Sequence, residues 1–151
     1  MKDNSIFVYG FGNPGRQDDG LGPAIIKKLE DENIPGIATD SNYQLNIEDA
    51  DNISGSDVVI FVDASIDADE PFSFSKIEPS AEITFTTHSM SPESVLALCM
   101  DIHNRAPEAY VMAIRGYEWE FLEGLSSKAM YNFNEAYQFL LGKINDMLKR
   151  K

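Results

Sequence analysis

The feature that most constrains this chain is a glycine-rich turn at residues 10–22, which reads GFGNPGRQDDGLG. A short apolar run at residues 6–9 precedes it, and a helical pattern begins near Leu21. Glycine lets the backbone approach other groups closely or take positive φ, and Pro14 cannot continue a strand ladder. The stretch is therefore predicted to hold something at the end of a strand. Two interpretations are open: a phosphate cradle, or a metal or catalytic site built on Asp18 and Asp19.

The rest of the chain alternates apolar runs with helical patterns. Continuous apolar segments at residues 57–63 and 109–114 predict buried strands, residues 37–39 a weak strand, and the alternating residues 72–77 a half-exposed or edge strand. Helices are expected from near residue 21, after a Ser91 cap and after a Ser126 cap. About five strands fit this length, so we expect one α/β domain, residues 1–151, with a parallel sheet covered on both faces.

The apolar sides of the last two predicted helices are expected to be buried. These side chains are Val95, Leu96, Leu98, Cys99 and Ile102 in the first helix, and Met130, Phe133, Ala136, Tyr137, Leu140, Leu141, Ile144 and Leu148 in the second.

Composition narrows the class of protein. A formal net charge of −13 argues against nucleic acid as a partner, because phosphates would be repelled. The apolar runs are far short of the ~20 residues that a membrane helix needs. The single cysteine, Cys99, excludes an internal disulfide framework and a multi-cysteine metal site. With no apolar leader before the first strand, we expect a cytoplasmic protein without a membrane segment. Nothing in the sequence requires more than a monomer.

Three polar side chains follow the ends of predicted strands. Asp19 comes after the first strand, Asp63 ends the strand at residues 57–63, and His88 follows a short extended segment. In a parallel sheet, ligands bind beyond the carboxyl ends of the strands, so the three side chains are expected to project toward one edge. Two carboxylates and an imidazole form a ligand set suited to Ni, Zn, Fe or Mn.

Each of these residues also has a structural interpretation. Asp19 alone would suit a helix cap, Asp63 a strand-end turn, and His88 a hydrogen-bonded loop. Only their coincidence at one edge favours a site. His103, at the end of a predicted helix, is not accompanied by other candidate ligands, and Cys99 lies on the apolar side of the same helix. Both residues are therefore expected to be structural.

The turn also matches the dinucleotide fingerprint G-x-G-x-x-G at residues 10–15. Pro14 removes a backbone donor that a phosphate cradle would use, and Asp18 and Asp19 put negative charge where a pyrophosphate would bind. Asp40 is only approximately placed to bind a ribose. A nucleotide-binding function therefore remains the weaker alternative.

Several motifs resemble those of the hydrogenase maturation proteases, in the same order along almost the whole chain. The most specific is Gly10-x-Gly12-Asn13-x-x-Arg16-x-Asp18-Asp19-Gly20-x-Gly22. It is followed by Val62-Asp63-Ala64, Thr87-His88, Ile114-Arg115-Gly116-Tyr117-Glu118 and Glu123-Gly124-Leu125-Ser126.

This resemblance implies a three-layer α/β/α sandwich with a twisted, mostly parallel sheet of about five strands. It also implies an endopeptidase that removes a C-terminal extension from the nickel-loaded large-subunit precursor of [NiFe]-hydrogenase. The metal-binding residues of the family fall on Asp19, Asp63 and His88, which would also be the catalytic residues. The nickel would come with the precursor, and no tightly bound organic cofactor is implied. Asp18 is then the candidate cap of the first helix.

Two departures from the family pattern stand out. Asp19 replaces the glutamate of some relatives, and residues 40–45 replace a Gly-Thr-x-Gly type of turn, which bears on substrate specificity. The sequence leaves open whether the metal is catalytic or only anchors the substrate, and which carboxylate would be a general base. A non-catalytic, metal-sensing assembly factor for hydrogenase is a further alternative.

Overall fold

In the computed structural model, which describes residues 5–79, 85–86 and 89–150, five strands form one sheet in the order β2-β1-β3-β7-β4. The strands are β1 (Ile6–Phe11), β2 (Ile37–Asn42), β3 (Val58–Ser65), β4 (Phe72–Ile77) and β7 (Glu108–Arg115). All neighbours are parallel except β4, which pairs antiparallel with β7 at one edge. Two short strands, β5 (Phe85–Thr86) and β6 (Ser89–Met90), form a separate antiparallel pair. The predicted α/β class and the edge position of residues 72–77 are confirmed.

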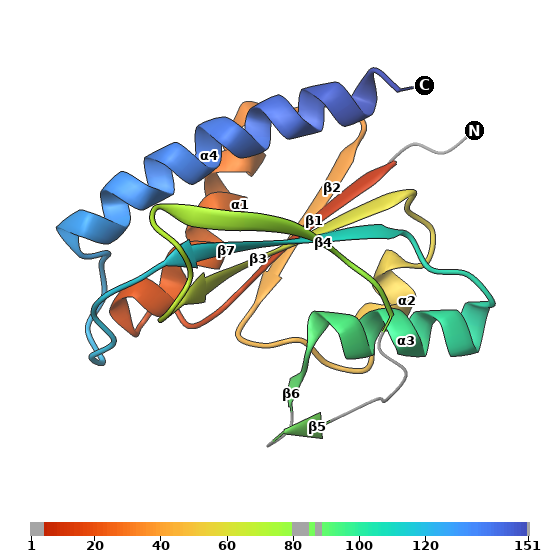
Figure 1. Ribbon diagram of the computed structural model, residues 1–151, viewed down its shortest axis with the longest axis horizontal. Helices are drawn as coiled ribbons and strands as arrows, with labels where there is room; N and C mark the ends of the chain where they lie inside the picture. The colour runs from red at the N-terminus through yellow and green to blue at the C-terminus, as the bar shows by residue number, and fades with distance from the viewer. Residues whose placement is uncertain (1–4, 80–84, 87–88, 151) are drawn as a thin grey trace.

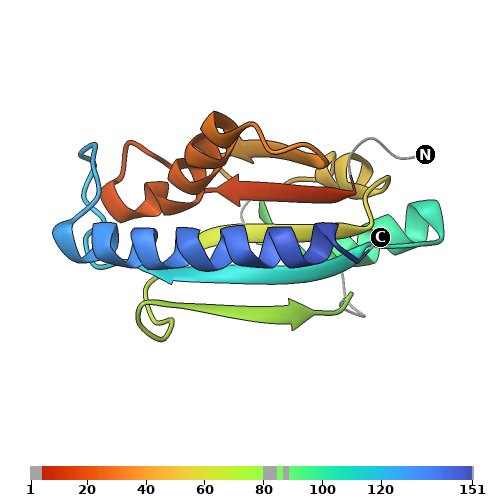
Figure 2. The same ribbon diagram turned by 90° about the horizontal axis from the view of Figure 1, so that it is seen from above.

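Helices cover both faces of the sheet (Figures 1 and 2). On one face lie α1 (Leu21–Glu32) and the long α4 (Ser127–Leu148), and on the other lie α2 (Asp49–Ile53) and α3 (Pro92–His103). Two buried clusters correspond to the two faces, because side chains alternate along each strand. In β3, Ile60 and Val62 belong to the first cluster, and Val59 and Phe61 to the second. The three-layer prediction is therefore confirmed.

The first helix packs unusually closely on the sheet. A Cβ on Gly22 would lie 2.6 Å from the carbonyl oxygens of both Phe11 and Val62. Only glycine fits at this contact, which lets the start of α1 approach the carboxyl ends of β1 and β3. The glycine-rich turn and the short 3-10 helix η1 (Gln17–Gly20) are thereby held against the same edge of the sheet.

Two predicted helices begin where the sequence indicated. Ser91 and Ser126 each have extended backbone, and their hydroxyls accept hydrogen bonds from the amides of Ser94 and Ala129. Two of the side chains expected in the core are instead exposed: Ile102 by 55% and Met130 by 45%. Ile102 lies in the last turn of α3 and Met130 in the first turn of α4. Among the described residues, no helix has the length and apolar character needed to cross a membrane.

Candidate metal and catalytic site

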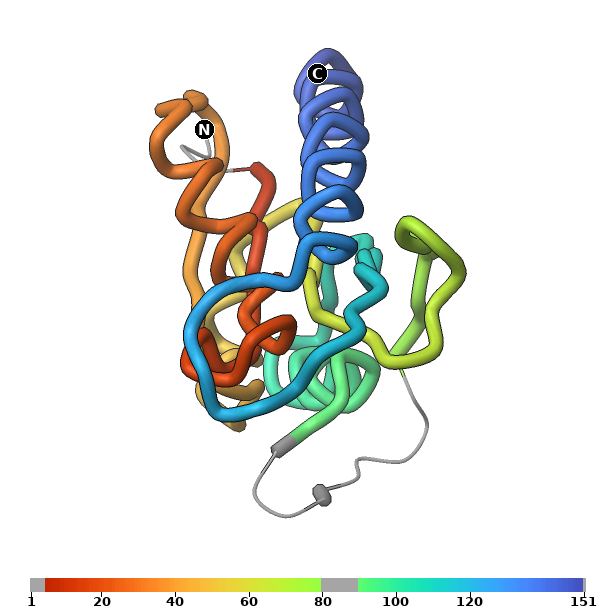
Figure 3. The backbone as a smooth tube through the Cα atoms, turned by 90° about the vertical axis from the view of Figure 1, so that its left-hand side faces the viewer, coloured from red at the N-terminus to blue at the C-terminus, as the bar shows by residue number. Residues whose placement is uncertain are grey.

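The loops that follow β1, β3 and β7 meet at one end of the molecule (Figure 3). The strand register fixes which side chains share a face there. Asp63 is opposite Ala113 of β7, and Ala113 is opposite Ser73 of β4, so the three side chains form one row across the sheet. This row lies on the α3 side, like Phe61 two residues earlier.

The backbone amides of the glycine-rich turn are hydrogen-bonded within the protein. Gly12 has a φ of +140°, and a Cβ there would lie 2.0 Å from the backbone oxygen of Asp19. Within the fully described residues 12–19, every amide donates to an oxygen of the protein. Four of these amides bind oxygens of the turn itself: Asn13 binds Asp19 Oδ2, Gly15 binds Asn13 Oδ1, Arg16 binds Asn13 O, and Asp19 binds Arg16 O. The other three bind carbonyl oxygens elsewhere: Gly12 binds Asn42 O, Gln17 binds Leu122 O, and Asp18 binds Glu118 O. A phosphate-binding loop needs backbone amides that are free to bind the phosphate, so this turn is not suited to bind one.

Asp18 is completely buried and its carboxylate is saturated. Oδ2 accepts from the amides of Tyr117 at 2.7 Å and Glu118 at 3.0 Å and from the hydroxyl of Ser126 at 2.7 Å. Oδ1 accepts from the amide of Ser126 at 2.8 Å. Burial alone would raise the pKa of Asp18, but these hydrogen bonds outweigh it and the pKa is lowered. The prediction that Asp18 caps the first helix is wrong, because its oxygens bind the segment between β7 and α4 instead.

Asp19 faces a different environment from its neighbour. Its Oδ2 accepts a hydrogen bond of 2.9 Å from the amide of Asn13, which orients the carboxylate. The side chain lines a hollow of about 330 Å³ together with Arg16, Ala64, Ile66 and Trp119. Of the two adjacent aspartates, Asp19 is thus the one that a ligand can reach.

Asp63 lies at the carboxyl end of β3, in a second and larger hollow. This hollow has a volume of about 510 Å³ and extends over Ala113 and Ser73 to Glu93 at the start of α3. Burial and, to a lesser degree, the nearby charge of Asp19 raise the pKa of Asp63 to about 7, and a hydrogen bond from the backbone of Ala64 only partly offsets them. A carboxyl with a pKa near neutrality is typical of functional sites.

The structure brings two of the three predicted site residues together. The charge of Asp19 acts on Asp63, and Ala64 lines the hollows of both. His88, the third, lies outside the described residues. Among the residues described, no group of three or more histidine, cysteine, aspartate or glutamate side chains could hold a metal ion.

Comparison with known proteins bears on this arrangement. The chain is 29% identical over 157 aligned residues to the "Putative hydrogenase maturation protease MJ0253" of Methanocaldococcus jannaschii, which covers 95% of this chain and 99% of that protein. The structure of the present chain matches that of the hydrogenase maturating endopeptidase HybD from E. coli with a TM-score of 0.73 and 18% identity, and the match covers 94% of this chain and 93% of that one. The predicted resemblance to the hydrogenase maturation proteases is confirmed.

A second solved structure shares the fold. The [NiFe] hydrogenase maturation protease HycI from Thermococcus kodakarensis matches with a TM-score of 0.70 and 17% identity, covering 93% of this chain and 92% of that one. No family model matches the chain. The sheet and helices described above are therefore those of the hydrogenase maturation protease fold.

Sequence reasoning missed how the segment after β7 is attached to the glycine-rich turn. Arg16 Nε donates to the carbonyl of Trp119 at 3.0 Å, and the amide of Gln17 donates to the carbonyl of Leu122 at 2.7 Å. With the four bonds to Asp18, these contacts join segments about a hundred residues apart in the chain. The one signal in the sequence was the pair of adjacent aspartates, only one of which a ligand site would need.

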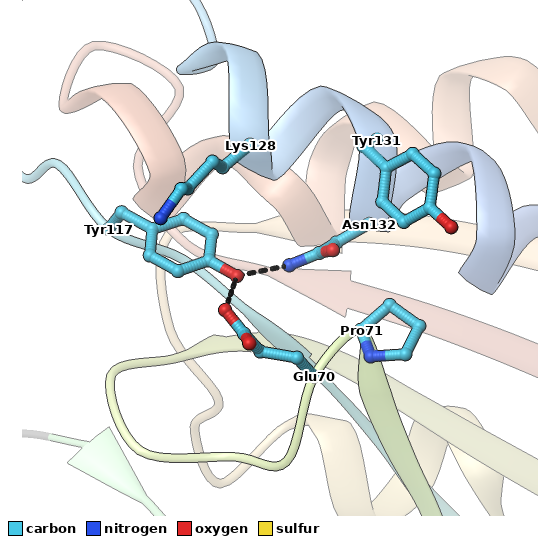
Figure 4. Close-up of a pocket in the computed structure, with 6 residues that line it drawn as sticks. All are labelled: Glu70, Pro71, Tyr117, Lys128, Tyr131 and Asn132. Atoms are coloured by element: carbon cyan, nitrogen blue, oxygen red, sulfur yellow. Dashed lines mark hydrogen bonds between the residues drawn. The ribbon is translucent and has the colours of Figure 1, made fainter.

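Tyr117 connects a further loop to α4 (Figure 4). Its hydroxyl donates to Glu70, in the loop after β3, and accepts a 2.8 Å hydrogen bond from Asn132 of α4. Lys128 lies over the ring, 5.2 Å from its centroid. These residues line a flanking hollow of about 330 Å³. They fix the loop after β3 relative to α4, and so fix the surroundings of Asp63 and Asp19.

Proposed function

We propose that this chain is an endopeptidase that removes the C-terminal extension of a nickel-loaded [NiFe]-hydrogenase large-subunit precursor. Asp19, Asp63 and His88 bind the nickel that the precursor brings, so that only loaded precursor is cut. The observation that carries the proposal is the electrostatic coupling of two reachable carboxylates at the carboxyl edge of the sheet. The likeness to hydrogenase maturation proteases over nearly the whole chain supports the choice of substrate.

The two carboxylates make the site selective for a cation. Before the substrate arrives, burial and the charge of Asp19 favour the protonated form of Asp63. An approaching divalent ion reverses this balance, because a nearby positive charge favours the carboxylate. The carboxyl of Asp63 then becomes fully ionised as the metal binds, whereas with a precursor without nickel it stays partly protonated near neutral pH.

The hollow beside Asp63 accommodates the chain to be cut. Serine hydroxyls at positions 65, 73 and 75 line it and can hydrogen-bond an extended peptide. The bound nickel can polarise the scissile carbonyl or activate water. If the metal serves only as an anchor, Asp63, with its pKa about 7, is suited to accept a proton from the attacking water.

The test is to incubate nickel-loaded precursor with the wild type and with Asp19→Asn, Asp63→Asn and His88→Ala, and to determine the precursor's C-terminus by mass spectrometry. We expect the wild type to release the extension and the three variants to lose at least about a hundredfold in rate, as expected for removal of a catalytic group. Asp146→Asn, which removes an exposed carboxylate near the C-terminal end of α4, is the matched control and should retain full activity.

The outcomes separate the alternatives. A precursor that binds but keeps its extension with the wild type would favour a non-catalytic assembly factor. Full cleavage by all three site variants would contradict the site assignment. Equal cleavage of precursor with and without nickel would contradict recognition through the metal.

A further inference from the structure

Three large apolar side chains are exposed on the two segments that follow β3 and β7. Ile66 is exposed by 71%, Phe121 by 81% and Leu122 by 61%. Ile66 lines the same hollow as Asp19 and Trp119, and Phe121 and Leu122 follow Trp119 in the chain. We call Ile66, Phe121 and Leu122 the apolar patch. Exposed apolar side chains that gather into a patch, especially one rimmed by polar residues, are typical of protein interaction sites, whereas single exposed apolar side chains are common.

The glycine-rich turn holds the segment that carries two of the three patch residues, Phe121 and Leu122. The guanidinium of Arg16 donates to the carbonyl of Trp119 and lies 5.7 Å from the centroid of the Phe121 ring. Gln17, with an unusual positive φ of 44°, donates its amide to Leu122, and its side-chain oxygen accepts from the amide of Glu120 at 2.9 Å. A surface that is already ordered loses less conformational entropy when a partner binds. The contacts therefore hold the exposed side chains ready for a partner.

The rim of the patch is acidic. Five exposed carboxylates flank the three apolar side chains in sequence: Asp67, Asp69, Glu118, Glu120 and Glu123. The two segments that carry them lie side by side, because the amide of Gly116 donates to the carbonyl of Ser65 at 2.9 Å and Tyr117 donates to Glu70. The whole chain has a net charge of −13. Charge complementarity therefore selects a partner with basic side chains around an apolar centre.

We propose that the apolar patch and its acidic rim dock a segment of the hydrogenase precursor that carries apolar side chains flanked by lysine or arginine. This inference rests on the proposed function and adds to it a second point of contact, next to the proposed nickel ligands. Docking at the patch brings the precursor to the hollow that Asp19 lines, and Ala64 connects that hollow with the one beside Asp63.

The test uses the full chain with Phe121 and Leu122 both replaced by alanine. Both side chains are exposed, so the fold should be unaffected, which the melting temperature checks. With nickel-loaded precursor, we expect KM to rise at least about tenfold, as for truncated anchors of an interface, while kcat stays within about twofold. KM of the wild type should also rise with salt, and Glu120→Lys should raise KM at low salt. Ile102→Ala, another truncation of an exposed apolar side chain, is the matched control; Ile102 lies in the last turn of α3, which leads to the opposite end of β7 from the patch.

Binding of the precursor, measured in parallel by calorimetry, keeps two failures apart. If the wild type binds the precursor without cutting it and the double variant binds about tenfold more weakly, the docking surface is supported and the proposed function is contradicted. If the double variant matches the wild type in both KM and affinity, the docking surface is overturned. Self-association of the wild type that the double variant abolishes would assign the patch to a second copy of this chain and would also overturn the proposal.

Discussion

Replacing Asp18 with asparagine should destabilise the protein strongly, although the change is isosteric. The carboxylate is completely buried and every group around it is a donor: three backbone amides and one hydroxyl. An asparagine NH₂ group would have to face at least one of these donors. One charge-assisted bond is lost, one N–H is left unsatisfied, and the remaining bonds weaken. Together these effects amount to about 3–5 kcal/mol.

This loss is large against the ~5–15 kcal/mol by which domains are usually stable. In a urea titration the midpoint should fall by about 2 M, taking a denaturant dependence of about 2 kcal/mol per M. Hydrogen exchange should accelerate at the amides of Tyr117, Glu118 and Ser126, whose hydrogen bonds to residue 18 are lost or weakened. Asp69→Asn, which alters an exposed carboxylate, should change the midpoint little.

The pH dependence gives a second check on the same variant. Because the pKa of Asp18 is lowered in the folded state, its stabilising effect is complete above the unfolded value of 3.8 and is lost as the pH falls through the folded pKa. The difference between wild type and variant should therefore be full at neutral pH and shrink in acid. A loss below about 1 kcal/mol at neutral pH, or a difference that grows in acid, would refute this stabilising role of the Asp18 carboxylate.

Three further predictions test separate features. Asp63→Asn should be more stable than the wild type above about pH 7 and equally stable near pH 4, because the raised pKa of Asp63 stabilises the folded state only while the carboxyl is protonated. Partial exposure of the side chain limits the difference in unfolding free energy to about 1–2 kcal/mol, which thermal unfolding from pH 4 to above pH 7 would measure. Gly12→Ala should cost at least about 3 kcal/mol in chemical denaturation, since its Cβ would lie 2.0 Å from a backbone oxygen, whereas Gly55→Ala, which has no atom within 4 Å of the new Cβ, should be tolerated. Ser126→Ala should lower the free energy of unfolding by about 2–3 kcal/mol and Ser91→Ala by about 1 kcal/mol, because both hydroxyls cap a helix but only that of Ser126 also binds a buried carboxylate. Similar losses in the two variants would contradict this additional role of Ser126.

The sequence predicted the sheet and helices well because their signals are local. The run of β-branched residues in β3 and the Ser91 and Ser126 caps each depend on neighbours within a few positions. The exposure of Ile102 and Met130 could not be seen in this way, because it depends on what the rest of the fold packs against each helix.

The candidate site could be predicted only in part. Strand ends indicated Asp19 and Asp63, since ligands of parallel sheets gather at one edge. The role of Asp18 depends on Tyr117, Glu118 and Ser126, which are about a hundred positions away, and no local pattern reports such a contact. The exposed patch was missed for the same reason: the fold brings Ile66 and Trp119 into one hollow, and their spacing in the chain gives no sign of it.

The row of Asp63, Ala113 and Ser73 makes the candidate site dependent on strand alignment. Eight residue pairs join β3 to β7, and most of the β3 side chains in them are buried. A slip of one residue would turn Asp63 to the α1 and α4 side and would replace it in the larger hollow with an apolar neighbour. The packing of the buried part of β3 thus determines on which side of the sheet the carboxylate lies. Substitutions deep in that strand, far from any ligand, should therefore alter activity before they unfold the protein.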